Sequence, residues 1–123
     1  MSSGVVFPLY GFAKDDRSMW LVESPDRILY HMEPIDIENG EYLLWDAKGR
    51  AVQISVQGNT VIGMAYADSE ISLEEAFKRY SDTYGLNVDT NGSVEEVWCR
   101  LKEAKAALPR RRGLFSKVFG KKA

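Results

Sequence analysis

Cysteine and histidine are almost absent from this chain, which holds one of each, Cys99 and His31. A lone cysteine forms no disulfide within the chain, so the fold needs no oxidising compartment. Common catalytic and nucleotide-binding motifs are also missing: there is no P-loop, G-x-G-x-x-G, G-x-S-x-G, C-x-x-C or H-E-x-x-H. These absences lower the expectation of an enzyme without excluding one.

Long hydrophobic runs are missing too. The longest, residues 5–13, is interrupted by Pro8 and Gly11 and is far shorter than the roughly 20 residues of a membrane-spanning helix. No basic residue precedes this run, which argues against a secretory signal. We therefore expect a cytoplasmic protein.

The composition that remains is ordinary for one folded domain, at 45% hydrophobic and 28% charged residues. The charge, however, is divided unevenly. Residues 109–123 hold six of the 16 Lys and Arg and no acid, so residues 1–108 keep ten basic residues against all 18 acids, a net charge of −8. We predict a single acidic domain over residues 1–108 and a basic tail over 109–123, which favours a separate electrostatic partner for the tail.

The first half of the body reads as strands around one short helix. Residues 5–10 and 19–23 predict a β-hairpin across a polar turn. Ser24, Pro25 and Asp26 form a helix-start signature, with the serine as the cap, and the helix is expected to end near Met32. Residues 34–37 are interpreted as a short extended piece.

A three-strand meander follows, over residues 42–46, 50–57 and 60–67. Its middle strand alternates apolar and polar residues with period 2, as a half-buried strand does. Two helices then end the body, each opening on a capping box, at Ser72–Glu75 and Ser93–Glu96. The order predicts an α+β fold: an antiparallel sheet of about five strands, with two C-terminal helices packed on one face.

Single residues give little evidence of chemistry. His31 beside Glu33 and Asp26 has the elements of a general base, the enzymatic alternative for this chain, but a lone histidine is more often structural. Cys99 lies mid-helix and is expected to be inert. We predict no catalytic residue from either one.

The loop over residues 87–95 resembles the start of an EF-hand calcium loop. Asn87, Asp89 and Asn91 match its first three oxygen positions and Gly92 its turn, but the closing carboxylate position falls on Trp98. A polar loop between helices is the favoured interpretation. We predict no metal and no cofactor.

Acidic residues gather in two sequence clusters, which we predict to contact a basic protein partner if they are more than solvated loops. The candidate partner-binding residues are Glu33, Asp36, Glu38, Glu41, Asp68 and Glu70. Nucleic-acid binding is not expected of so acidic a body. No small-molecule substrate is identified.

The tail combines positive charge with apolar side chains. If it is helical, its apolar residues share one face beside the basic ones, as in a helix that lies on anionic lipid. The residues concerned are Arg110, Arg111, Arg112, Leu114, Phe115, Lys117, Val118, Phe119, Lys121 and Lys122. Residues 113–120 resemble the C-terminal membrane-targeting helix of the bacterial Min-system ATPase MinD, which implies contact with the inner membrane and carries no implication about ATPase activity. Self-docking, disorder, nucleic acid and an acidic protein remain alternatives.

The leading hypothesis from the sequence is a bacterial, non-enzymatic binding protein that engages a protein partner through its acidic loops or its sheet. A toxin-immunity protein is one such role, by analogy of size and charge. The alternatives are a peripheral membrane adaptor that uses the tail, and a small enzyme built on His31 and nearby carboxylates.

Overall fold

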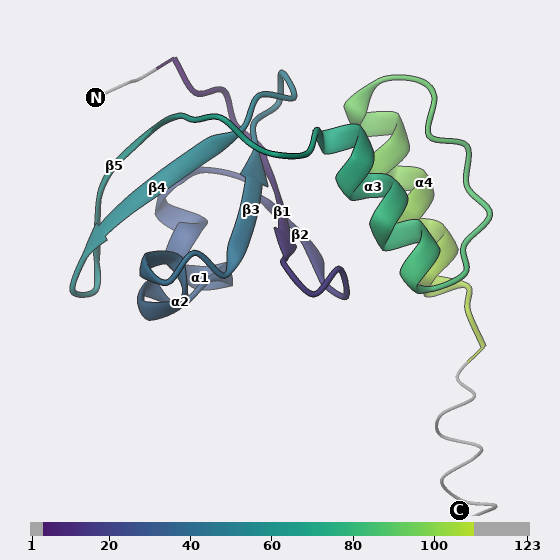
Figure 1. Cartoon of the computed structure of the whole chain (residues 1–123), viewed down its shortest axis with the longest axis horizontal. Coiled ribbons are helices and arrows are strands. Elements are labelled where there is room, and N and C mark those ends of the chain that lie inside the picture. Colours follow the sequence, from purple (N-terminus) through teal and green to yellow (C-terminus); the bar gives the residue numbers. More distant parts are fainter. Residues whose placement is uncertain (1–3, 110–123) are drawn as a thin grey trace, which may run out of the picture.

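The structure is a computed structural model that describes residues 4–109. It has mixed α and β content, with strands first and the two longest helices last (Figure 1). In chain order the elements are β1 (Leu9–Ala13), β2 (Met19–Val22), a 3-10 turn (Pro25–Arg27), α1 (Ile28–His31), α2 (Pro34–Glu38), β3 (Tyr42–Trp45), β4 (Val52–Gln57), β5 (Thr60–Tyr66), α3 (Leu73–Thr83) and α4 (Val94–Ala106). The predicted α+β class is thereby confirmed.

The strands form two antiparallel sheets rather than one. The first sheet has the order β2-β1-β3, and the second is the hairpin β4-β5. A single bridge, Trp45 to Ala51, joins them. The three predicted meander strands therefore exist, but the expectation that they continue one five-stranded sheet is wrong.

Because the β4-β5 hairpin is separate from the three-stranded sheet, the chain can bury that sheet on both faces. On one face, Tyr10, Phe12 and Trp45 pack with α3 and α4, through Phe77 and Leu101. We call this the helical face. The predicted packing of the two helices against the sheet is confirmed here, because every buried residue of α3 and α4 except Ser81 belongs to this cluster.

On the opposite face, which we call the hairpin face, Leu9, Val22 and Leu44 pack with Val52 and Ile54 of β4. Ile28 and Met32, from the segment of α1, complete this second cluster. A flat five-stranded sheet would leave these apolar side chains in water, and burial of an aliphatic side chain stabilises the fold by about 1.5–3 kcal/mol. Folding the β4-β5 hairpin over the face removes that cost.

Three local predictions are corrected. Residues 34–37 form helix α2 and not an extended piece, because Pro34 occupies its first turn, where its missing N–H costs nothing. The first strand begins at Leu9 rather than Val5. Ser24 makes no side-chain cap, since its hydroxyl donates to Asp26 Oδ1 at 2.5 Å.

Asp46, at the turn between β3 and β4, is fully buried and ties four segments together. Its Oδ1 accepts from the backbone N–H groups of Lys48 (2.9 Å) and Arg50 (3.1 Å), and its Oδ2 from the Val6 N–H (3.1 Å). The Tyr66 hydroxyl of β5 lies 2.6 Å from the same Oδ2. Burial alone would raise the pKa of Asp46, but these hydrogen bonds together hold the pKa below its ordinary value.

Candidate functional site

Beyond the Trp45–Ala51 bridge, β3 and β4 diverge and leave a cleft between the two sheets. Figure 1 shows the two strands close together at their shared turn and farther apart towards α2. The chain that leaves β5 also lines this cleft, through residues 67–69, on its way to α3. The cleft has a volume of about 320 Å³.

Both walls of the cleft carry unpaired strand edges. In an antiparallel pair, consecutive residues direct their N–H and C=O groups to opposite sides. The Lys14 N–H donates to Glu41 O and the Asp46 N–H to Arg50 O, which fixes that alternation in β3. It follows that Tyr42 and Leu44 turn their backbone groups away from β1 and towards β4.

The same reasoning applies to β4. The Ala67 N–H donates to Ala51 O, and the register pairs Gln53 with Ala65. Val52 and Ile54 therefore direct their backbone groups away from β5, into the cleft. Trp45 and Ala51 turn their own backbone groups to β1 and β5, so their bridge is held by the groups on either side of it, and no further bridge extends the β3-β4 ladder. The open edges therefore begin beyond the level of Leu44 and Val52, at Tyr42 in β3 and Ile54 in β4.

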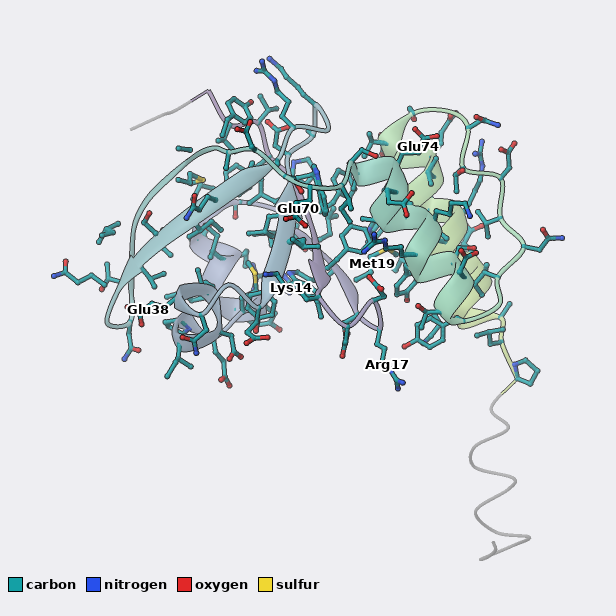
Figure 2. The ribbon with its side chains drawn as sticks, in the orientation of Figure 1. Lys14, Arg17, Met19, Glu38, Glu70 and Glu74 are labelled. Atoms are coloured by element: carbon teal, nitrogen blue, oxygen red, sulfur yellow. The ribbon has the colours of Figure 1, made fainter. Side chains whose placement is uncertain are left out.

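The cleft has an apolar floor and an acidic rim. Apolar side chains come from both sheets and from α2, and the charged side chains of Glu38, Asp68 and Lys14 also line the cleft. Figure 2 shows Lys14 near the centre of the molecule, with Glu70 above it and Glu38 to its left. The apolar residues are Ile37, Leu43, Leu44, Ala51, Val52, Ile54 and Ala67.

The predicted acidic clusters come together only in part. Glu38 and Asp68, one from each cluster, line the same cleft. Asp36 instead accepts a hydrogen bond from the Tyr42 hydroxyl at 3.2 Å, and Glu33 stands at the start of α2. Glu41 and Glu70 are exposed on neighbouring segments and do not line the cleft.

The rim acids are not neutralised by partners in the described chain. Within residues 4–109 the ion pairs are His31–Glu23, Lys78–Asp82, Arg79–Glu75 and Arg100–Glu96. Glu38 and Asp68 take part in none of them, and both side chains are exposed. The rim therefore keeps its negative charge available to a ligand.

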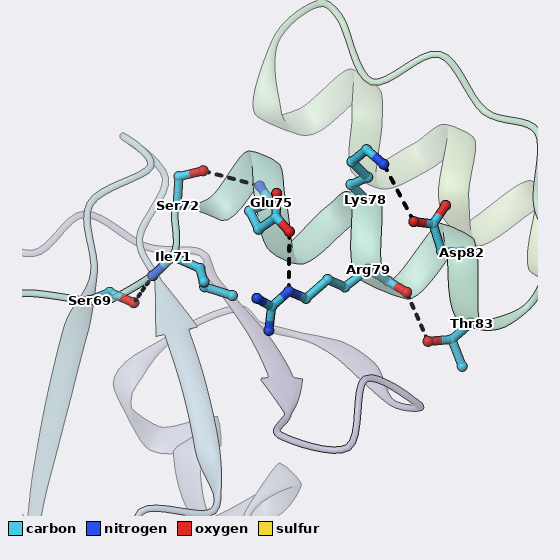
Figure 3. A network of polar contacts seen from close by, with 8 residues as sticks. All are labelled: Ser69, Ile71, Ser72, Glu75, Lys78, Arg79, Asp82 and Thr83. Carbon is cyan, nitrogen blue, oxygen red and sulfur yellow. Dashed lines mark hydrogen bonds and ion pairs between the residues drawn. The ribbon is translucent and has the colours of Figure 1, made fainter.

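Glu75, in the first turn of α3, is engaged within the helix itself (Figure 3). Ser72 Oγ accepts from the Glu75 N–H at 3.1 Å, but the Glu75 carboxylate turns to Arg79 Nε at 3.2 Å. The predicted capping box is thus only half formed here. At Ser93 it is complete, since Glu96 also accepts from the Ser93 N–H.

His31 does not meet the carboxylates expected for it. Its Nε2 lies 3.5 Å from Glu23 Oε1, rather than beside Glu33 or Asp26. Hydrogen bonds from its own backbone N–H and from His31 hold the pKa of Glu23 below its ordinary value. His31 lines neither this cleft nor the cavity on the helical face described below.

The loop that resembles a calcium site is organised by a side chain of the protein. Arg100 Nη1 donates to the backbone oxygens of Asp89 (3.0 Å) and Asn91 (2.5 Å). Asp89 Oδ1 accepts from the Asn91 N–H at 3.0 Å. The guanidinium thus binds the loop carbonyls, which agrees with the interpretation of these residues as a polar loop.

The sequence alone does not single out Asp46 or the open strand edges. The signal available for Asp46 is its residue type between two predicted strands, since Asp favours turns by bonding N–H groups two residues on. Nothing in the sequence indicates that the β3-β4 ladder would stop after one bridge.

Comparison with known proteins finds no family model that matches the chain, and no curated protein or solved structure that matches it. Of the helices within residues 4–109, none is long and apolar enough to span a bilayer. The tail residues, and with them the MinD-like segment 113–120, lie outside the described residues.

Proposed function

We propose that this protein is a non-enzymatic binding protein that holds a short, extended, basic segment of a protein partner in the cleft between β3 and β4. The observation that carries the proposal is the pair of unpaired strand edges facing each other between Glu38 and Asp68. A toxin-immunity role is one form that such binding takes.

The strand edges supply the affinity in this proposal. An extended segment adds to an exposed sheet edge by main-chain hydrogen bonds, and pockets for alternate side chains supply specificity. Tyr42 on one side and Ile54 on the other offer such groups, beyond the level of Leu44 and Val52 where the two strands last meet. The apolar floor then takes a small aliphatic side chain of the partner.

Charge selects the partner and speeds its arrival. The body carries a net charge of −8, and the rim acids face no counter-charge within residues 4–109 except Lys14. Complementary charge raises association rates and excludes partners of the wrong sign. A partner segment rich in Lys or Arg fits these requirements.

A direct test uses fluorescence anisotropy of the full chain with two labelled peptides of alternating sequence, Lys-Val and Glu-Val. We expect saturable binding of the Lys-Val peptide alone, weakened severalfold by the double variant Glu38→Gln/Asp68→Asn, since each exposed charge pair contributes about 0.2–1 kcal/mol. The matched control, Asp82→Asn/Glu103→Gln, removes the same charge from α3 and α4. Equal weakening by both double variants would reduce the effect to net charge and refute the cleft.

The second candidate, a peripheral membrane adaptor, is supported by the sequence of the tail, whose six basic residues flank Leu114, Phe115, Val118 and Phe119. Vesicles containing phosphatidylserine should bind the full chain, and the variant Phe115→Ser/Phe119→Ser should bind less while keeping its charge. Equal flotation of the two proteins would remove the membrane proposal and leave the cleft proposal untouched.

The enzymatic alternative gains no support from the geometry of His31. Within residues 4–109 its ion-pair partner is Glu23, which lies 3.5 Å away with a side chain that is 60% exposed. His31 lines neither the β3-β4 cleft nor the cavity beside α4, so neither brings a substrate to it, and one exposed pair is not the constellation that catalysis needs.

A further inference from the structure

A second cavity lies on the helical face, between the start of α4 and the strands β1 and β2, and has a volume of about 390 Å³. Its walls are mainly apolar and aromatic, with polar groups at one side. The lining residues that matter here are Pro8, Tyr10, Leu21, Val94, Glu95 and Trp98. The volume falls in the range of small-molecule sites, which are mostly apolar with a few polar groups.

Tyr10 brings an unpartnered hydroxyl to this cavity. The residue is 4% exposed, and its ring is held edge-on by Phe77 and Trp98, each with its centroid at 6.3 Å. Its hydroxyl makes no hydrogen bond to any residue in the described part of the chain. Burial first, and then the nearby Glu95 and Cys99, raises the pKa of Tyr10, which agrees with a hydroxyl that faces Glu95.

Trp98 adds a second group that the protein does not satisfy. Its indole nitrogen is buried and has no hydrogen-bond partner within residues 4–109. An indole N–H is a donor, which an ammonium ligand does not satisfy, so Trp98 contributes its aromatic ring to the site and not its N–H. The Trp98 ring also already attracts a cation, because Lys102 Nζ lies 4.9 Å from its centroid.

Glu95 determines which sign of charge the ligand should carry. Its carboxylate is exposed at the rim of the cavity and belongs to none of the ion pairs of residues 4–109. The first turn of α4 holds Glu95 and Glu96, and these acids outweigh the partial positive charge of the helix terminus. Aromatic walls and a free carboxylate together favour a cation with an apolar body.

We propose that this cavity binds a small arylalkylamine, a primary ammonium joined by a short chain to an aromatic ring. The ammonium pairs with Glu95 and donates to the Tyr10 hydroxyl. The aromatic ring packs on Pro8, Leu21 and Val94 beside Trp98. This site is separate from the cleft between β3 and β4 and does not depend on the function proposed for it.

The test is a titration of the ¹⁵N-labelled full chain with three matched probes: 2-phenylethylamine, 2-phenylethanol and 3-phenylpropionate. We expect saturable shifts of the Trp98 indole N–H and the Val94 and Glu95 amides with the amine. Glu95→Gln and Tyr10→Phe should each weaken the affinity for the amine by about fivefold, as loss of one exposed charge pair or one hydrogen bond does. Glu103→Gln, further along the same helix, should leave the affinity unchanged.

Three outcomes would overturn the proposal. The first is that the alcohol or the carboxylate binds as tightly as the amine, because Glu95 then selects nothing. The second is an unchanged affinity in Glu95→Gln, a surface variant that is expected to fold normally. The third is that no probe shifts these resonances, or that the shifts fall on Leu44 and Val52 of the cleft instead.

Discussion

The two faces of the three-stranded sheet are covered in different ways. The helical face is closed by α3 and α4, whose own backbone groups are paired within each helix, and its core is largely aromatic. The hairpin face is covered by β4 and β5 and has an aliphatic core. A helix covers a sheet without exposing a strand edge, whereas a hairpin brings edges of its own.

The difference locates the proposed binding function. Within residues 4–109, two strand edges face each other without a ladder where the β4-β5 hairpin diverges from the sheet, after the Trp45–Ala51 bridge. The helical face offers a cavity enclosed by side chains instead. An extended peptide therefore suits the first face and a small molecule the second.

The largest expected effect tests the helical face. Phe77→Ala removes a ring that is 3% exposed and packs edge-on against Phe12 at 5.6 Å. We expect the free energy of unfolding to fall by about 3–5 kcal/mol, measured by urea denaturation. The control Ile62→Ala, at a β5 residue that is 60% exposed, should change it by less than about 0.5 kcal/mol. Similar values for both would mean that the helices do not bury this face.

Asp46 joins the two sheets, so its substitution should cause the next largest decrease in the free energy of unfolding. Asp46→Asn places an amide N–H₂ against backbone donors, and we expect a loss of about 3 kcal/mol, the upper range for buried unpaired groups. Asp82→Asn, on the exposed side of α3, is the control.

Acid titration of stability separates the charge of Asp46 from its packing. Because its folded pKa lies below the ordinary value of 3.8, the unfolded chain takes up the proton first as the pH falls. The stability that this carboxylate contributes is therefore complete well above that value and is lost as the pH drops through the folded pKa. Asp46→Asn should flatten this part of the pH profile, and an unchanged profile would contradict the assignment.

A smaller effect concerns the centre of the sheet. A methyl group on Gly11 would lie 2.4 Å from Trp20 Nε1, so Gly11→Ala should overpack the β1-β2 pair and cost about 1–3 kcal/mol. Gly63→Ala in β5, where nothing lies within 4 Å of the added carbon, is the matched control. Thermal unfolding that ranked Gly63→Ala as the more damaging would reverse the comparison.

The smallest effect compares the two helix caps. Ser93→Ala breaks a complete capping box and should cost about 1 kcal/mol, whereas Ser72→Ala loses one hydrogen bond and should cost less. Urea denaturation of the two variants is sensitive enough to rank them. A larger loss of stability in Ser72→Ala would contradict the pairing of the Glu75 side chain with Arg79.

Local signals predicted the elements well, because each is set by nearby residues. The alternation in strand β4 and the serine caps at Ser72 and Ser93 appear in the structure. The features that the sequence did not predict depend on packing between residues that are distant in the chain. Whether β4 continues the sheet or folds over Leu9 is decided by burial of residues far apart in the sequence. The choice of Glu23 as the partner of His31 also depends on the fold.

The site shows the same division. Both acidic clusters were identified from composition, but their meeting at Glu38 and Asp68 required the fold. Asp36 is engaged by Tyr42, which no sequence spacing indicated. The sequence therefore indicates which residues are acidic, but the cleft that two of them line follows only from the separation of the two sheets.

The central claim is that the edges of β3 and β4 are open beyond the bridge, and amide hydrogen exchange of the full chain tests it most directly. We expect the amides of Tyr42 and Ile54 to exchange much faster than those of Leu43 and Gln53, which pair with β1 and β5. Addition of the Lys-Val peptide should slow the first group selectively. Strong protection of Tyr42 and Ile54 in the free protein would instead mean one continuous five-stranded sheet, and no cleft for a partner to fill.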